Sequence, residues 1–189
     1  MSNAPIYLPD WMTVVRKGHT QKLKEGFHPQ PGELDNHDWM CLFSRVYQAP
    51  LSKVDTLLKI LIERGGNINA SNAFGVTALE DMMHVCVEET WPYLDLFVKH
   101  GTDIKSLQDK LIGLLASHGN ADGILWLDKQ GVDVTLCYGK STYEIFKQWA
   151  HDLNCPISDE IEYLLHIKPL KEHLEKTLPT SPPKPVKRV

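Results

Sequence analysis

Short apolar segments with a helical period recur along the chain, and three of them stop at a glycine. In each, apolar side chains fall seven, five and four positions before the glycine, which gives one broad buried helical face. The glycines are Gly65, Gly101 and Gly131, so 36 and then 30 residues separate the stops. Glycine ends a helix because it reaches the left-handed conformation without a Cβ clash. The pattern therefore predicts three helices that end at these glycines.

A short polar run follows each glycine and carries a β-branched residue three positions on, namely Ile68, Ile104 and Val134. We expect these side chains to point inward and to hold each turn against its neighbour. One helix pair cannot cover its own apolar face, so neighbouring pairs must stack. The sequence thus predicts an all-α fold, a helical-repeat solenoid of about four helix pairs with capping helices at the N-terminal and C-terminal ends.

The segment 65–79 resembles the turn, hairpin and inner-helix start of an ankyrin repeat. In that family a Thr-Pro-Leu-His tetrapeptide opens the inner helix, and here Thr77, Ala78, Leu79 and Glu80 occupy those places. Two of the four positions agree, and Thr77 with Glu80 also forms a capping-box pattern that favours helix initiation. The resemblance implies degenerate ankyrin repeats and a protein-binding role, and it is clearest over residues 57–104.

Three regions are expected from these segments: an N-terminal tail over residues 1–8, an ankyrin-like repeat domain over 9–168, and a short helix with a proline-rich tail over 169–189. Within the tail, residues 182–187 fit a PxxPxK ligand for grooves that accept polyproline helices. An extended, disordered tail explains the same prolines.

Composition limits the classes of partner. The net charge is −4 and basic residues are scattered except at the C-terminus, so we expect no nucleic acid partner. No window approaches the ~20 apolar residues of a membrane span, and the N-terminus lacks the apolar run of a signal peptide. The four cysteines lack CxxC spacing. We therefore expect a cytoplasmic protein, although export by a specialised route stays open.

Motifs for catalysis or cofactor binding are weak. Residues 139–142 match the end of a phosphate-binding loop, but position 134 lacks the required glycine, and a hairpin with Ser141 as helix N-cap explains them. His151 and Cys155 have the spacing of metal ligands on one helical face, without a second pair nearby. We expect no cofactor, no metal, no small-molecule substrate and no enzymatic activity. The alternative is a small enzyme on a helical-repeat scaffold, with a site among Cys86, His84 and Glu80.

Two aromatic residues, Phe74 and Tyr138, occupy turn positions where the repeat pattern expects exposed polar residues. Binding energy at protein interfaces concentrates in a few aromatic or arginine anchors. Both rings are therefore candidate contacts for a partner protein, unless they fold back over a neighbouring unit.

Three further positions are candidates on the helix that follows the first turn. Glu80, Asp81 and His84 have the spacing of a polar strip, although the wet side of an amphipathic helix looks the same. Trp91 joins them because Pro92 suggests an inserted loop. The sequence predicts a module that binds one folded protein through the turn tips and the inner-helix face, as an inhibitor, an immunity-like neutraliser or an effector adaptor.

Overall fold

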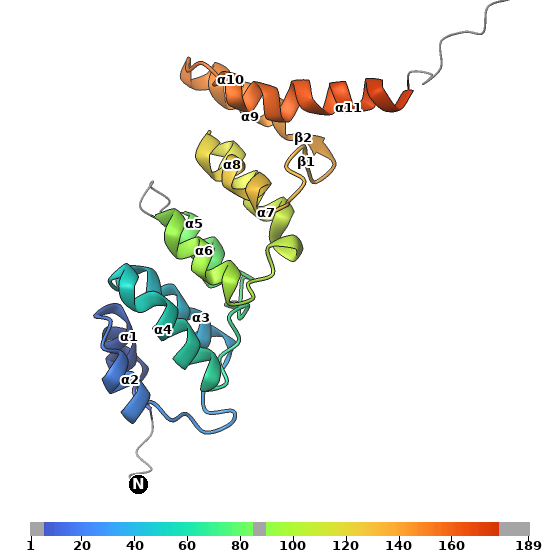
Figure 1. Cartoon of the computed structure of the whole chain (residues 1–189). Helices are drawn as coiled ribbons and strands as arrows, with labels where there is room; N and C mark the ends of the chain where they lie inside the picture. Colours follow the sequence, from blue (N-terminus) through green and yellow to red (C-terminus); the bar gives the residue numbers. More distant parts are fainter. Residues whose placement is uncertain (1–5, 85–89, 178–189) are drawn as a thin grey trace, which may run out of the picture. The chain divides into compact units, whose positions relative to one another are not determined.

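The computed structural model describes residues 6–84 and 90–177 (Figure 1). Those residues are mostly helical with one two-stranded sheet, which confirms the all-α prediction at this level. They contain no helix with the length and apolar content that crossing a membrane requires. The chain divides into two compact units, residues 1–111 and 112–189. Cys86, a residue of the enzymatic alternative, and the proline-rich tail 178–189 lie outside the described residues.

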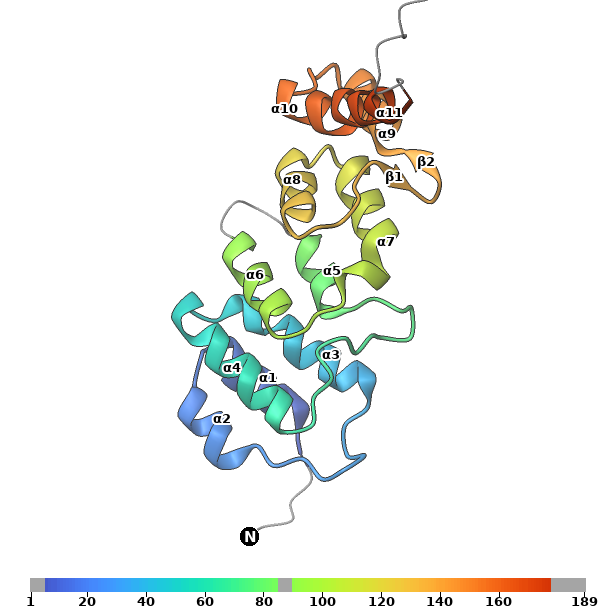
Figure 2. The same cartoon turned by 45° about the vertical axis from the view of Figure 1, so that its right-hand side comes forward.

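The first unit consists of helix pairs. Its elements are α1 (Leu8–Arg16), α2 (Thr20–Gly26), α3 (Asn36–Ser44), the 3-10 turn η1 (Val46–Gln48), α4 (Leu51–Glu63), α5 (Ala78–Met83), α6 (Trp91–Lys99) and the first part of α7 (Ile104–Ser117). Helices α1, α3 and α5 contact one another in succession, and so do α2, α4 and α6. Each pair therefore packs against the next through two rows of helices, which Figure 2 shows from the side.

A continuous apolar core runs through this first unit. The predicted helical face before Gly65 is buried through Leu58, Ile60 and Leu61 of α4. Before Gly101, Leu94 and Phe97 of α6 are buried as predicted, whereas Leu96 is only partly buried. Aromatic rings link successive pairs with centroid separations of 5.2 to 6.5 Å. The linked rings are Trp11, Phe27, Trp39, Phe43 and Phe97.

The second unit contains the end of α7, then α8 (Ala121–Lys129), β1 (Leu136–Cys137), β2 (Lys140–Ser141), α9 (Thr142–Leu153), α10 (Asp159–Glu162), the π-helical turn η3 (Tyr163–Ile167) and α11 (Lys168–Thr177). Its core is built by apolar residues from every helix except α11. The predicted face before Gly131 is buried here as well, through Ile124, Trp126 and Leu127.

The three predicted glycine stops share one backbone geometry. Gly65, Gly101 and Gly131 have φ of 91°, 97° and 78°, so each lies in the left-handed region. After each one, the next N–H donates to a carbonyl five residues back, at 3.0 to 3.1 Å. This bond is the signature of a Schellman cap, which satisfies carbonyls that the helix end leaves free. Helix α9 ends in the same way with Asn154 at φ 50° instead of a glycine.

The C-terminal helices differ from the sequence prediction, which placed a boundary between the repeat domain 9–168 and the short helix that begins at Pro169. Backbone helix continues from α10 through η3 into α11. A proline inside a helix lacks an N–H and crowds the carbonyl four residues earlier. Here the turn before Pro169 is π-helical, and the N–H of Lys168 bonds to the carbonyl of Tyr163. The wider turn relieves the clash, so the proline does not end the helix.

Candidate functional site

The turn that presents Phe74 is a closed, hydrogen-bonded tip. An isolated antiparallel bridge joins Ser71 to Thr77 at its base. Above that bridge, the Asn72 N–H donates to the Val76 carbonyl at 3.0 Å, and the Gly75 N–H donates to the Asn72 carbonyl at 2.9 Å. Gly75 has φ 72°, a conformation that a side chain would strain. The backbone of residues 71–77 is therefore fixed by its own bonds.

The Asn72 side chain closes the tip from within. Its Oδ1 accepts from the N–H groups of Phe74 and Val76, at 2.9 and 3.0 Å. The Phe74 side chain is 90% exposed, so the ring does not fold back over the neighbouring helices. An aromatic ring therefore projects into solvent from a backbone that cannot easily rearrange.

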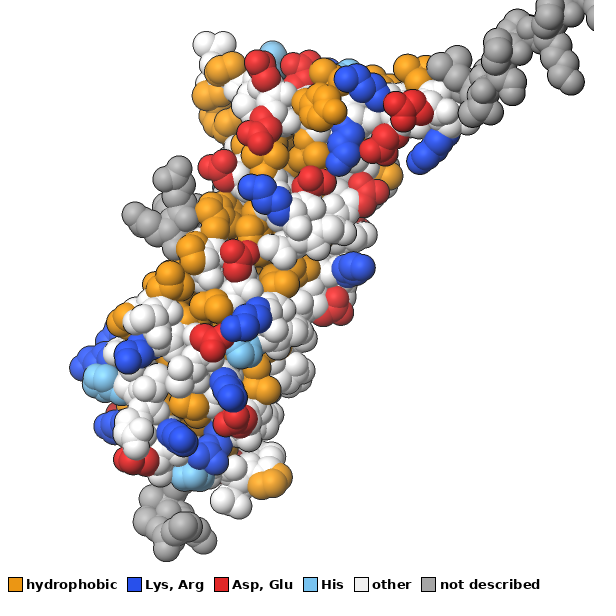
Figure 3. All heavy atoms as spheres, viewed as in Figure 1, with side chains coloured by type: hydrophobic (Ala, Val, Ile, Leu, Met, Phe, Trp, Pro, Cys, Tyr) orange, Lys and Arg blue, Asp and Glu red, His pale blue; other side chains and the backbone are white. Residues whose placement is uncertain are grey.

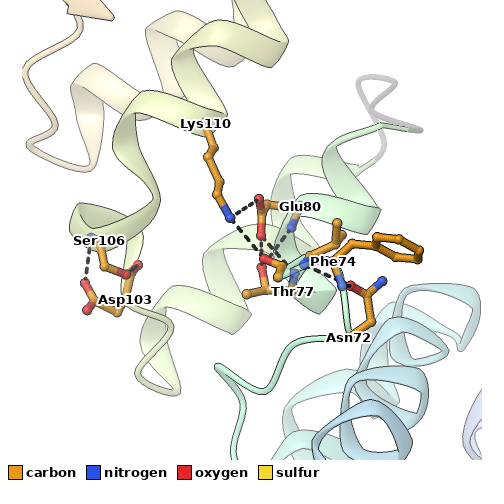
Figure 4. A network of polar contacts seen from close by, with 9 residues as sticks. Asn72, Phe74, Thr77, Glu80, Asp103, Ser106 and Lys110 are labelled. Carbon is orange, nitrogen blue, oxygen red and sulfur yellow. Dashed lines mark hydrogen bonds and ion pairs between the residues drawn. The ribbon is translucent and has the colours of Figure 1, made fainter. Parts of the chain in front are cut away.

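A polar network supports this tip from behind (Figure 4). Thr77 is the N-cap of α5, and Glu80 completes a capping box with it, as the sequence predicted. Glu80 Oε2 accepts from the N–H and the hydroxyl of Thr77 at 2.8 and 2.9 Å, while its Oε1 lies 3.5 Å from Lys110 Nζ. Lys110, on α7, also donates to the Gly75 carbonyl at 3.0 Å. The Lys110 side chain thus links the tip and the start of α5 to α7.

Glu80 was predicted on an exposed strip, and that placement is wrong. The residue is only 7% exposed, because its carboxylate turns back to the cap and meets Lys110. Asp81 and His84 are exposed as expected. The inner-helix strip therefore reduces to Asp81 and His84 among the described residues. The Glu80 carboxylate is engaged in the cap of α5, and the enzymatic alternative stays a prediction because Cys86 lies outside the described residues.

Trp91 was expected in an inserted loop, and this too is corrected. It is the first residue of α6, with Pro92 in the first helical turn and the tryptophan partly buried. Proline is common at this position, since its missing N–H would have no helical partner there. Pro92 therefore marks a helix start. Trp91 therefore lies at the start of a helix and not in an exposed loop.

Tyr138 lies at the tip of a β-hairpin in the second unit. Cys137 pairs with Lys140, so the loop between the strands consists of Tyr138 and Gly139 alone. Both have positive φ, 50° and 74°, as a type I′ turn requires. The Tyr138 side chain is 66% exposed and Leu136 beside it is 53% exposed, whereas Cys137 is buried. This hairpin, and not a phosphate-binding loop, accounts for residues 139–142.

Successive turns of the first unit are joined by a residue that the sequence reading did not single out. The Asn69 amide donates to the Gly101 carbonyl at 3.1 Å and accepts from the Asp103 N–H at 2.9 Å. Asn69 thereby connects two turns that are equivalent in the repeat pattern. The sequence signal for Asn69 was its position in the polar run that follows a glycine stop. No comparable signal in the sequence pointed to Lys110.

Metal ligands do not converge anywhere in the described part of the chain. His151 Nδ1 lies 3.3 Å from Asp152, and the exposed Cys155 thiol points to the Leu153 carbonyl at 3.5 Å. An apolar groove of about 830 Å³ lies along α9, lined by Ile145, Trp149 and Leu153 with a polar rim. The rim carries the polar side chains of Ser117, His118, Lys140, Ser141, Glu144, Gln148 and Asp152.

Comparison of the chain with protein-family models, with curated proteins and with solved structures gave no match.

Proposed function

We propose that this protein is a binding module built from degenerate ankyrin-like helix pairs, which recognises one folded protein through its turn tips. The single observation that carries the proposal is the Phe74 tip. Phe74 is 90% exposed and contributes nothing to the core, so its apolar area is available for burial in an external contact.

Rigidity of the tip adds to this argument. Binding loses part of its free energy when loops and side chains must be ordered at the interface. The Asn72 side chain, the Gly75 turn and Lys110 order this loop in advance. Because the tip is already ordered, less of the free energy gained by burying Phe74 in a complex is lost to ordering the loop.

Tyr138 is the equivalent anchor that we propose for the second unit, also on a short tight turn with an exposed apolar neighbour in Leu136. Asp81 and His84, which are exposed on α5 and at its end, are the polar contacts that we propose for the same partner. None of the described cysteines forms a disulfide, and we propose a reducing cytoplasm as the compartment.

The test places a photo-crosslinking phenylalanine analogue at position 74, at position 138, or at Tyr7 as the control. Tyr7 is an aromatic residue of similar exposure, 65%, on the first unit. Expression in the native host should give one cross-linked protein from positions 74 and 138 and none from position 7. Identical products from all three positions, or no product from position 74, would refute the placement of the site.

Alanine variants check the same proposal quantitatively. Phe74→Ala and Tyr138→Ala together should abolish capture of the cross-linked protein. They should leave the melting temperature nearly unchanged, because neither ring belongs to the core. Tyr7→Ala should keep full capture. A variant with both rings removed that still captures the protein at the wild-type level would contradict the proposal.

A further inference from the structure

Two arginines line one small pocket of the first unit. Arg16 lies in the last turn of α1, and Arg45 is the residue that ends α3 and precedes η1. Helix α1 contacts both α3 and η1, so the packing of these elements brings the two side chains to the same place. The pocket has a volume of about 390 Å³, and the rest of its lining is Pro9, Met12 and Thr13. We call it the two-arginine pocket.

Neither guanidinium has a partner within the part of the chain that the structure describes. No hydrogen bond and no ion pair joins Arg16 or Arg45 to another described residue. Arg64 in the same unit is different, since its Nη2 donates to the Lys24 carbonyl at 2.8 Å. The donors of both pocket arginines are therefore free to bind a ligand.

The pocket also lacks a compensating negative charge, because none of its lining residues carries a carboxylate. Burial raises the pKa of the Cys41 thiol, on which the charge of Arg45 also acts, together with those of Asp38, Asp81 and Asp35. Among the described residues, no ion pair joins these carboxylates to Arg45. Elsewhere on this unit Lys and Arg side chains lie among Asp and Glu side chains, as the face in Figure 3 shows. Two unpaired like charges in one pocket favour an anion between them.

The helix dipole explains only part of this arrangement. A basic side chain near the end of a helix is stabilised by the partial negative charge there. That effect accounts separately for Arg16 at the end of α1 and for Arg45 at the end of α3. It does not require both side chains to line the same pocket, and it gives neither guanidinium a hydrogen-bond acceptor.

The two guanidiniums determine the head group of the ligand. Arginine keeps its proton in proteins, and its planar fork of donors matches carboxylate and phosphate oxygens. A phosphate monoester carries close to two negative charges at neutral pH and has three strong acceptor oxygens. A carboxylate carries one charge and two oxygens. The pair of arginines therefore matches a phosphate monoester better than a carboxylate.

The other walls determine what the phosphate is attached to. Met12 and Pro9 contribute apolar surface, and the Thr13 hydroxyl is engaged, since it donates to the Pro9 carbonyl at 3.1 Å. A methionine side chain adapts its shape and makes favourable contacts with aromatic rings. The volume of about 390 Å³ lies within the range of small-molecule sites. The pocket therefore suits a phosphate ester whose other end is an aromatic ring.

We propose that the two-arginine pocket binds an aryl phosphate monoester, with the phosphate between Arg16 and Arg45 and the ring against Met12. This site is separate from the turn tips, because no residue of either tip lines it. A small phosphate ester and the phosphotyrosine side chain of another protein both present this chemistry.

The experiment titrates the full-length protein, labelled with ¹⁵N, with phenyl phosphate at low ionic strength. NMR follows the arginine Nε–H signals. Those of Arg16 and Arg45 should shift and saturate, whereas that of Arg64 should stay in place. Inorganic phosphate lacks the ring and benzoate lacks the second charge. Each of these two probes should therefore bind at least about fivefold more weakly than phenyl phosphate.

Arg16→Gln and Arg45→Gln should each weaken binding of phenyl phosphate at least about tenfold, because each removes charge-assisted hydrogen bonds. The matched control is Lys17→Gln, which removes the same charge from the next residue, an exposed side chain that does not line the pocket. It should bind as wild type does. Circular dichroism checks the fold of all variants. If Arg45→Gln does not fold, Arg45→Lys replaces it, and loss of the planar fork should still weaken binding.

A short peptide with one phosphotyrosine separates the two sources of the ligand. Tighter binding of this peptide than of phenyl phosphate would support the proposal and assign the pocket to a modified side chain of another protein. Equal or weaker binding, with phenyl phosphate still bound, would support it and assign the pocket to a small aryl phosphate.

Three results would overturn the proposal. The first is the absence of a saturable shift at Arg16 and Arg45. The second is equal affinity for phenyl phosphate and either simpler probe, which would mean an adventitious ion only in the case of inorganic phosphate. The third is a loss of binding in Lys17→Gln as large as in the arginine variants, which would make net charge, and not the pocket, responsible.

Discussion

Asn154 ends α9 in the position that glycine occupies at the other stops of the repeat pattern. Its φ of 50° lies in the left-handed region, and the following N–H bonds to the Ala150 carbonyl at 2.9 Å. Asparagine tolerates this conformation better than other residues with a Cβ, and glycine tolerates it best.

Replacement of Asn154 by alanine should therefore lower the free energy of unfolding of the second unit by about 1 kcal/mol. Asn154→Gly should keep or raise it. Urea denaturation followed by tryptophan fluorescence measures both values. Equal stability of the alanine and glycine variants would show that the cap geometry does not govern this helix end.

The cap of α5 gives a second prediction for a single residue. Thr77 accepts from the Glu80 N–H through its hydroxyl and is buried. Thr77→Ala should cost about 1 kcal/mol of stability, since a helix N-terminal donor loses its partner. Thr77→Ser keeps the oxygen and should cost clearly less. Chemical denaturation distinguishes the two, and a serine variant as unstable as the alanine variant would contradict the capping role.

The caps of this chain could be predicted from the sequence, whereas the burial of Glu80 could not. Glycine stops and the Thr77–Glu80 box depend on residues within a few positions of one another. Glu80 is drawn inward by Lys110, a residue 30 positions later whose approach depends on the packing of α7. Local spacing contains no information about such a contact, so the prediction that Glu80 lies on the solvent-exposed side of its helix was wrong.

At the scale of elements, helices α4 and α6 are tied by a charge pair as well as by apolar packing. Asp55 Oδ1 lies 2.7 Å from Lys99 Nζ and 3.1 Å from His100 Nε2. These hydrogen bonds, that of Lys99 first, hold the pKa of Asp55 below its ordinary value of 3.8. A carboxyl with a lowered folded-state pKa stabilises the fold above its unfolded pKa. That stabilisation is lost as the pH falls through the folded pKa.

Asp55→Asn should therefore lower the unfolding midpoint near neutral pH, and the difference from wild type should vanish on acidification below the ordinary carboxyl pKa. The effect should be small and should shrink with added salt, because the Asp55 side chain is about half exposed. Thermal unfolding at a series of pH values measures it. A difference that persists unchanged in acid would mean that the asparagine acts through packing and not through charge.

The order and type of the helices followed from the sequence, while two prolines were misread. Pro92 predicts a loop from the sequence but lies in the first turn of α6. Pro169 predicts a boundary but lies within continuous helix, after the π turn at Tyr163–Ile167. Proline forbids only a particular hydrogen bond and carbonyl position. Where the helix start or a wider turn removes that conflict, sequence alone does not reveal it.

For the molecule as a whole, short-range packing is the main feature of the first unit. Helices α1, α3 and α5 pack in succession, and so do α2, α4 and α6, while α1 contacts α2 and α5 contacts α6. In repeat architectures such packing makes stability a sum of local terms and of interfaces between neighbours. Each of the two units also has its own buried core. Loss of core packing in one unit should therefore remain a local event.

Leu58→Ala tests this consequence in the first unit. Leu58 is fully buried in α4, and removal of its side chain should cost about 2 to 5 kcal/mol. Hydrogen exchange measured by mass spectrometry should then accelerate across α3, α4 and α6, while the amides of α8 and α9 keep their wild-type protection. The mirror variant Leu127→Ala, at an equally buried site of the second unit, should give the opposite distribution. If either variant accelerated exchange to the same extent in both units, the chain would unfold as a single cooperative body, and the additive description of its helix pairs would have to be abandoned.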